Sequence, residues 1–183
     1  QLFFTSMKLL YSIPDKLYYI QNFLDYSMYK GIHDAIFKER KNINLHTSKG
    51  LWEDNLITNI VPPKRVGVDK YPPFEKLKTL THHNQFYQLK DFKSIATNIH
   101  YMEKGAGINW HSDDGWKYGA TYYINNRWNI QYGGELMFNS GNNHGYIPIV
   151  GNSLVILKSP INHKVNPVLS PIIPRVSVQM FIK

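Results

Sequence analysis

The chain of 183 residues contains no cysteine. This absence excludes disulfide bonds, zinc–thiolate sites, iron–sulfur clusters and a cysteine nucleophile, but it leaves the redox compartment open. Long apolar runs are missing too, because none approaches the roughly 18 residues that a membrane-spanning helix needs. No signal peptide is recognisable at the start of the chain. We therefore expect a cytoplasmic protein that does not enter a membrane.

Acidic residues are scarce. The 13 Asp and Glu residues stand against 21 Lys and Arg residues, which gives a formal net charge of +8. Such a surplus favours an anionic partner. Hydrophobic residues make up 43% of the chain, so a wholly disordered protein is excluded. The length fits one domain, which we expect to span residues 7–183, while residues 1–6 resemble the remnant of an expression vector.

The N-terminal part predicts a helical layer. The aromatic and aliphatic run at 17–24 predicts a strand and a turn, and Asp25 stands where a helix cap belongs. The helix that follows should end near residue 38. Its residues Met28, Ile32 and Ile36 recur at helical spacing and predict one buried face.

The C-terminal half predicts a β structure. Six short apolar or alternating segments are separated by Gly, Asn and Pro, at 95–102, 118–125, 133–138, 145–150, 152–158 and 176–183. This pattern favours an antiparallel sandwich or barrel. The intervening region 38–93 predicts strands and long loops, with a short helix near 74–80. The fold class is therefore α+β and mainly β, with N-terminal helices packed on one side of the core.

Three residues predict a metal site. His111 and Asp113 are two positions apart, so in an extended segment their side chains point the same way. His163 follows the strand predicted at 152–158 and could add a third ligand from a facing strand. Two histidines and one carboxylate form the facial triad of non-haem iron(II) oxygenases. The alternative is structural, with Asp113 capping a turn and His163 a surface residue.

A basic residue follows the candidate ligands. Arg175 lies twelve positions after His163 and opens the last predicted strand. From there its guanidinium could reach into a barrel and bind a carboxylate through two parallel hydrogen bonds, which a lysine does less well.

From about residue 17 to residue 183, the chain resembles the iron(II)- and 2-oxoglutarate-dependent dioxygenases, most closely their prolyl 4-hydroxylase-like branch. The resemblance does not extend to residues 41–93. It rests on the segments NIHYMEKGAGINWHSDD, YYINNRWNIQYGGELMF, VGNSLVILKSPINHKVNPV and RVSVQMF. It implies a double-stranded β-helix, a jelly-roll or cupin-like barrel, in which His111, Asp113 and His163 hold Fe(II).

The resemblance also implies a cosubstrate and a reaction. Arg175 matches the residue that binds the distal carboxylate of 2-oxoglutarate, and Tyr101 and Tyr123 match its hydroxyl partners. Ser177, on the same strand face as Arg175, could also touch that carboxylate. With dioxygen, and with ascorbate as a candidate reductant, the cosubstrate would give succinate and CO2 while a C–H bond is hydroxylated. The branch favours a prolyl residue in a peptide or protein as the substrate.

Two alternative functions stay open. Oxidative demethylases of alkylated nucleic acid resemble the chain in fold, and the +8 charge suits them, but they typically carry an arginine where this chain has Phe181. A binding protein without catalysis is the other alternative, although the complete triad and Arg175 argue against it.

The substrate surface is predicted from two residue classes. Trp110 and Trp116 stand beside the predicted ligands and could line a peptide groove. Much of the positive charge lies in the N-terminal half, which suggests an acidic protein target at least as readily as nucleic acid. The basic residues there include Lys38, Arg40, Lys41, Lys64, Arg65, Lys70, Lys76 and Lys78.

Overall fold

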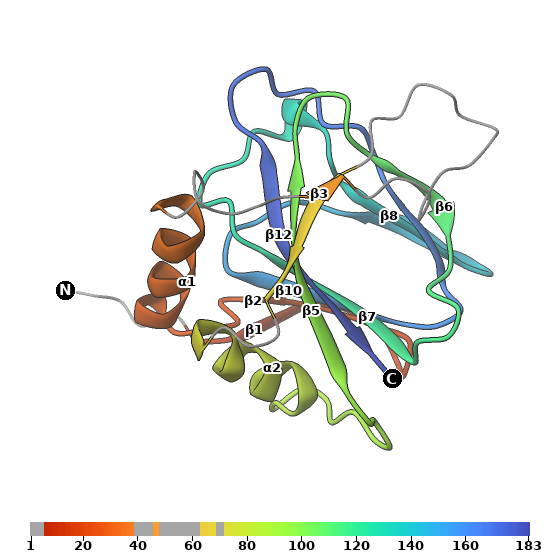
Figure 1. Ribbon diagram of the computed structural model, residues 1–183. Helices are drawn as coiled ribbons and strands as arrows, with labels where there is room; N and C mark the ends of the chain where they lie inside the picture. The colour runs from red at the N-terminus through yellow and green to blue at the C-terminus, as the bar shows by residue number, and fades with distance from the viewer. Residues whose placement is uncertain (1–5, 39–45, 48–62, 69–71) are drawn as a thin grey trace.

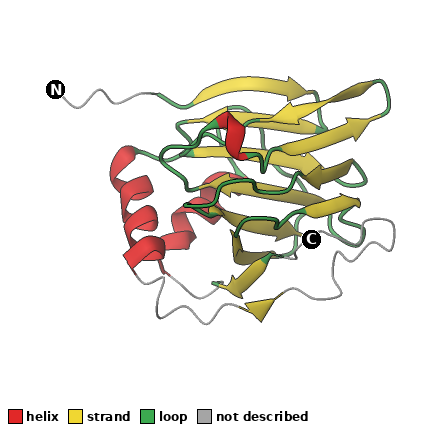
Figure 2. Ribbon diagram, turned by 90° about the horizontal axis from the view of Figure 1, so that it is seen from above, coloured by secondary structure: helices red, strands yellow, loops and turns green. Residues whose placement is uncertain are grey.

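The computed structural model describes residues 6–38, 46–47, 63–68 and 72–183 (Figure 1). Two antiparallel sheets dominate this part of the chain, and the helices lie on one side of them (Figure 2). This arrangement confirms the mainly β, jelly-roll-type prediction. Apart from Ser6, the predicted vector remnant lies outside the described residues, as do Arg40, Lys41 and Lys70.

Within the described residues the larger sheet has eight strands. In spatial order they are β1 (Lys8–Ile13), β2 (Leu17–Gln21), β10 (Ser153–Lys158), β7 (Tyr118–Tyr123), β12 (Arg175–Ile182), β5 (Ile95–Met102), β4 (Lys64–Gly67) and β3 (His46–Thr47). The smaller sheet consists of β6 (Ile108–His111), β11 (Asn162–Val165), β8 (Leu136–Ser140) and β9 (Asn143–Ile147). Each of the six predicted segments overlaps a strand, although β8 and β9 extend beyond the predicted bounds.

Helix α1 (Tyr26–Lys38) begins as predicted, because the Asp25 carboxylate accepts a hydrogen bond of 2.9 Å from the backbone N–H of Met28. Ile32 and Ile36 are buried, but Met28 is 39% exposed, so the prediction for Met28 is wrong. Tyr29 is buried instead, because the buried face of the helix is formed by residues 29, 32 and 36. The Tyr29 hydroxyl donates to the carbonyl oxygen of Ile124 at 2.9 Å.

The two faces of the larger sheet differ in chemistry. On β12, Val176 and Val178 pack into the core under α1 and under α2 (Glu75–His82), which the 3-10 turn η2 (Pro72–Phe74) precedes. The alternate residues, beginning with Arg175 and Ser177, face the space between the sheets. Strand alternation therefore places a row of polar side chains inside the barrel.

The helical layer is joined to the barrel by a buried amide. The Asn152 side chain accepts hydrogen bonds from the Leu24 N–H (2.9 Å) and the Tyr122 hydroxyl (2.8 Å), and donates to the Leu24 carbonyl oxygen (2.8 Å). Asn152 has a φ of 58°, a left-handed conformation that asparagine tolerates better than most residues. In the part of the chain that the structure describes, no helix is both long and apolar enough to span a membrane.

Candidate metal centre

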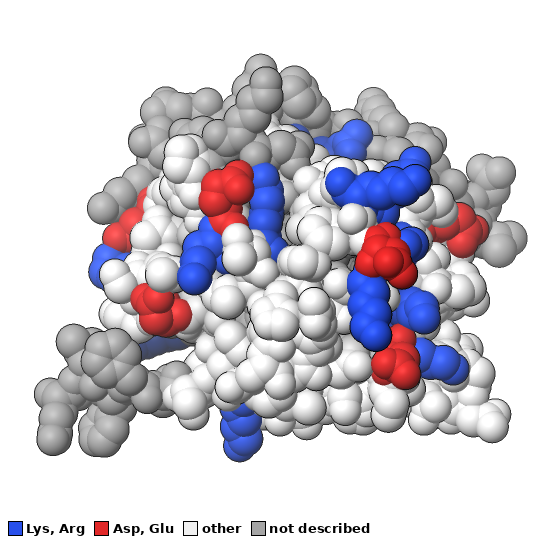
Figure 3. Space-filling model, turned by 90° about the horizontal axis from the view of Figure 1, so that it is seen from below, with Lys and Arg blue, Asp and Glu red and all other residues white. Residues whose placement is uncertain are grey.

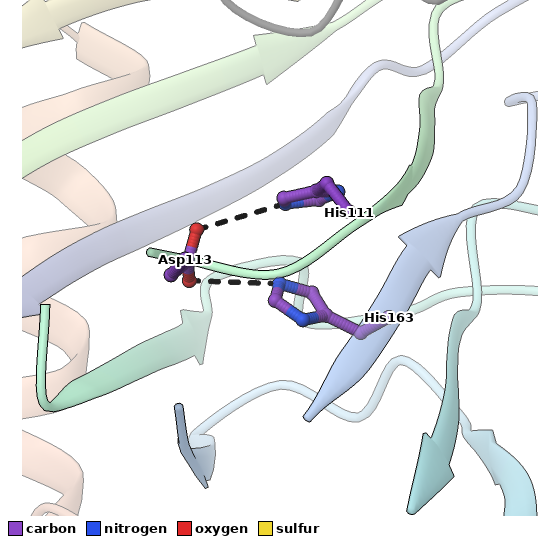
Figure 4. Close-up of side chains that lie close together, drawn as sticks. All are labelled: His111, Asp113 and His163. Carbon is purple, nitrogen blue, oxygen red and sulfur yellow. Dashed lines mark ion pairs between the residues drawn. The ribbon is translucent and has the colours of Figure 1, made fainter. Parts of the chain in front are cut away.

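The side chains of the three predicted ligands lie close together and point toward one another (Figure 4). His111 ends β6, and His163 lies directly opposite it on β11. Asp113 bridges the two imidazoles, with Oδ1 3.7 Å from His111 Nε2 and Oδ2 3.6 Å from His163 Nε2. The candidate ligand atoms all lie within 4.8 Å of one another, close enough for one ion to bind all three.

Backbone carbonyls orient both imidazoles. His111 Nδ1 lies 2.7 Å from the Asn109 carbonyl oxygen, and His163 Nδ1 lies 2.9 Å from that of Ile161. A carbonyl oxygen only accepts, so each Nδ1 carries the proton and each Nε2 lone pair faces the carboxylate. Burial and the neighbouring His163 lower the pKa of His111, which favours the neutral form that binds metal.

The carboxylate of Asp113 faces the two imidazoles rather than the turn that follows it. Its side chain is 9% exposed and packs against Gly119 of β7, where a Cβ would overlap Oδ2. The turn itself is closed by the main chain, because Trp116 N donates to the Asp113 carbonyl oxygen at 3.0 Å. The structural interpretation of Asp113 therefore does not explain where its carboxylate lies.

A buried cation stands deeper in the barrel. Arg175 is 1% exposed, and its Nη1 donates to Ser177 Oγ at 3.1 Å. The buried Tyr123 hydroxyl interacts with the charge of Arg175, whose guanidinium lies over the Tyr123 ring at 5.2 Å. Within the part of the chain that the structure describes, neither this hydroxyl nor Arg175 Nε has a well-formed hydrogen bond. Among the described residues no carboxylate forms an ion pair with Arg175, and burial lowers its pKa. A buried cation without a counter-ion is costly, so this site suits an anionic ligand.

Gly134 makes room for this arginine. Its φ is +76°, and a Cβ at this position would lie 3.0 Å from Arg175 Cδ. Two features therefore favour glycine at this position of the Gly-Gly turn before β8: the left-handed backbone and the close approach of a buried side chain.

The structure does not bring Tyr101 to this site. Tyr101 lies on β5 and packs in the core between the sheet and the helices, together with Val176. Neighbouring residues on a strand point to opposite faces, so Met102 faces the barrel interior instead. Its sulfur lies 3.5 Å from Arg175 Nη1. Tyr123, by contrast, stands on the interior face of β7.

Sequence reasoning missed His100 as a neighbour of the site. His100 is 2% exposed and is the register partner of Ser177 on one side and of Arg65 on the other. Burial, with the charges of Arg175 and Arg65, lowers the pKa of His100 to about 3. The available signal was its spacing of two from Met102, which places both side chains on one strand face.

A cavity of about 360 Å³ opens beside the triad, and His111 and Asp113 form part of its wall. Trp116 and Phe181 also line it, with ring centroids 5.5 Å apart. Trp110 does not, since it precedes His111 on β6 and faces outward, 43% exposed. Only one of the two tryptophans predicted to line a substrate groove therefore reaches this cavity.

The chain is similar to known proteins in part of its sequence and in its fold. Residues 97–183 match the sequence model of the 2OG-Fe(II) oxygenase superfamily. Comparison with curated protein sequences gives no match. Among solved structures, a prolyl-4-hydroxylase from Pseudomonas putida superposes with a TM-score of 0.71 at 15% identity, covering 92% of both chains.

Two further structures are similar. A prolyl hydroxylase from Trichoplax adhaerens, in complex with a hypoxia inducible factor oxygen degradation domain peptide fragment, gives a TM-score of 0.72 at 16% identity, over 92% of this chain and 84% of that one. The viral collagen prolyl hydroxylase of Paramecium bursaria Chlorella virus-1 gives 0.62 at 12% identity, over 92% and 96%. At these identities the likeness concerns the fold.

Proposed function

We propose that the chain, whose residues 97–183 match the sequence model of the 2OG-Fe(II) oxygenase superfamily, hydroxylates a prolyl residue in a peptide or protein, using Fe(II) and 2-oxoglutarate. The observation that carries this proposal is the pairing of the His111–Asp113–His163 cluster with a buried arginine, which forms no ion pair with the acidic residues that the structure describes. When bound, the iron and cosubstrate supply the oxidation by dioxygen, in which 2-oxoglutarate becomes succinate and CO2 as the C–H bond is hydroxylated.

The chain's own residues would bind and orient the reactants. His111, Asp113 and His163 would hold the metal. Arg175 would bind the distal carboxylate of 2-oxoglutarate through its guanidinium, which the Ser177 hydroxyl holds in place. The buried Tyr123 hydroxyl, beside the guanidinium, would donate to the same carboxylate.

Two aromatic residues of the cavity beside the triad support the proposal of a prolyl substrate. Trp116 and Phe181 offer two aromatic surfaces against which an apolar five-membered ring can pack. The similar fold of the Trichoplax adhaerens enzyme, which was solved with a peptide fragment, supports a peptide as the ligand of this face.

Nucleic acid is the less favoured substrate. Among the described residues on the face shown in Figure 3, lysine and arginine side chains are interspersed with acidic ones. Phe181 lines the cavity where demethylases typically carry an arginine, so a hydrogen-bonding group for a phosphate or base is replaced by an apolar ring.

The test has two stages. Fe(II) and 2-oxoglutarate are first added without oxygen, and the visible charge-transfer band of the chelate is recorded for the wild type, His163→Ala and the control His144→Ala, whose side chain is exposed on β9. The band should appear in the wild type and the control alone. If folded wild-type protein gives no charge-transfer band and releases no succinate in air, the oxygenase proposal is rejected. The alternative is then a binding protein without catalysis.

Succinate release is then measured in air, with ascorbate, for prolyl peptides against methylated oligonucleotides. Faster release with prolyl peptides, together with a mass gain of one oxygen atom, is expected. Faster release with the oligonucleotides would overturn the prolyl assignment in favour of a demethylase.

A further inference from the structure

A second arginine lines the cavity beside the metal centre. Arg65 lies on β4 and comes from the larger sheet, whereas His111 and Asp113 come from the end of β6 and the turn after it. From this position we propose that Arg65 binds a carboxylate of the substrate, next to the prolyl ring, and thereby determines specificity. This inference rests on the proposed function and adds a substrate feature to it.

The charge of Arg65 has no acidic partner among the residues that the structure describes. None of the acidic residues that the structure describes forms an ion pair with it. Its neighbour Lys64, which points the other way from the strand, pairs with Glu103 at 2.9 Å. The nearby Asp114 accepts a hydrogen bond of 2.9 Å from the Ser112 hydroxyl, and Asp113 faces the imidazoles. A half-buried guanidinium in a cavity is thus available to a ligand.

The two arginines of the barrel have different access. Both of their charges lower the pKa of His100, so they flank this side chain from two sides. Arg175 is fully buried beneath the centre, whereas Arg65 borders the cavity that opens to the surface. A small cosubstrate enclosed in the barrel suits Arg175, and a group on a larger, partly exposed substrate suits Arg65.

The cavity walls define the chemistry of the ligand. Trp116 and Phe181 provide apolar surface, the Asn98 amide offers one donor and one acceptor to a peptide backbone, and Arg65 provides the fork that binds a carboxylate through two hydrogen bonds. Arg65 lines the same cavity of about 360 Å³ as the two aromatic rings, so a carboxylate bound there lies close to the prolyl ring. The carboxylate is therefore that of an adjacent Asp or Glu, or the α-carboxylate of a terminal proline.

The experiment compares matched peptides. One pair carries Glu or Gln next to an internal proline, and a second pair ends in proline as the free acid or the amide. For each, coupled succinate release and the Kd of a fluorescently labelled peptide for protein loaded with Mn(II) and 2-oxoglutarate are measured. The proteins are the wild type, Arg65→Gln, Arg65→Lys and the control Lys64→Gln, each checked by its melting temperature.

The wild type should prefer one carboxylate-bearing peptide over its neutral partner by roughly ten- to a hundredfold in Kd and in kcat/KM, the range of one charge-assisted hydrogen-bonded contact. Which pair shows the preference identifies the source of the carboxylate. Arg65→Gln should bring the ratio close to one, Arg65→Lys should keep part of it, and Lys64→Gln should retain it.

The inference is overturned if the wild type has no preference in either pair, if no peptide binds, or if Arg65→Gln keeps the wild-type ratio. Its failure is separable from that of the proposed function. A preference in Kd without any prolyl turnover would reject prolyl hydroxylation and keep Arg65 as the carboxylate site. Prolyl turnover without a preference for the carboxylate-bearing peptides would reject Arg65 as the carboxylate site and keep prolyl hydroxylation.

Discussion

The carboxylate of Asp113 lies directly against the backbone of Gly119, in the space that a side chain at position 119 would fill. A Cβ on Gly119 would overlap Oδ2 and lie 3.6 Å from Cγ of the same aspartate. The position of this predicted metal ligand thus depends on the absence of a side chain at residue 119 of β7. This relationship predicts the effect of the smallest substitution there.

Gly119→Ala should displace the Asp113 carboxylate from the imidazoles and weaken metal binding by roughly ten- to a hundredfold, the effect typical of disturbed ligand orientation. Calorimetric titration with Mn(II) measures it. Gly31→Ala is the matched control, because nothing lies within 4 Å of a Cβ at that position in α1. The control should bind metal normally and gain up to about 1 kcal/mol of stability. Unchanged metal affinity in Gly119→Ala would contradict the geometry.

Arg175→Met should abolish 2-oxoglutarate binding and leave metal affinity in place. It should not lower the free energy of unfolding of the ligand-free protein, because it removes a buried charge that forms no ion pair with any acidic residue in the described part of the chain. Urea unfolding without ligand and titration of the anaerobic chelate band provide the two readouts. If Arg175→Met gives the band at the same 2-oxoglutarate concentrations as the wild type, Arg175 does not bind 2-oxoglutarate.

His100 should make the fold sensitive to acid. Its pKa of about 3 in the folded chain lies below the value near 6.5 of an unfolded chain. Between these values the unfolded chain binds the extra proton, so the free energy of unfolding falls as the pH drops, by on the order of 1.4 kcal/mol per pH unit.

The variant His100→Gln cannot take up this proton, so its stability should depend less on pH. Between pH 6.5 and 5 the wild type should lose about 2 kcal/mol more than the variant does. Urea unfolding of metal-free protein at several pH values measures the difference. His144→Gln, on the exposed part of β9, should follow the wild type. Parallel curves for the wild type and His100→Gln would exclude His100 as the source.

Asn152→Ala should destabilise the attachment of the helical layer. The change leaves the buried groups of Leu24 and Tyr122 without their partner and puts alanine at a φ of 58°. A loss of about 2–4 kcal/mol is expected from unsatisfied polar groups. Urea unfolding checks it, with the exposed Asn143→Ala as a control that should lose little. A loss below about 1 kcal/mol would mean that solvent replaces these hydrogen bonds.

The sequence predicted the parts of the site that depend on short spacing. His111 and Asp113 are two residues apart on an extended segment, so their convergence follows from strand geometry alone. The cap at Asp25 and the strand containing Arg175 are equally local. These predictions needed no knowledge of which strands become neighbours.

The errors come from periodicity and from register. Tyr101 and Met102 differ by one position, which on a strand is the difference between the helix-side core and the barrel interior. Met28 failed for the same kind of reason, because one helical position rotates a side chain by about 100°. The place of His100 between two arginines depends on the pairing of β4, β5 and β12, which no local pattern records.

The carbonyl oxygens behind His111 and His163 have an evolutionary consequence. Every residue type carries a backbone carbonyl, so substitution at Asn109 or Ile161 leaves the acceptor for each Nδ1 proton in place. The orientation of both imidazoles is therefore inherited with the path of the main chain rather than with particular side chains. A centre built this way tolerates extensive change in the surrounding sequence, which fits a fold shared with enzymes that are only 12–16% identical.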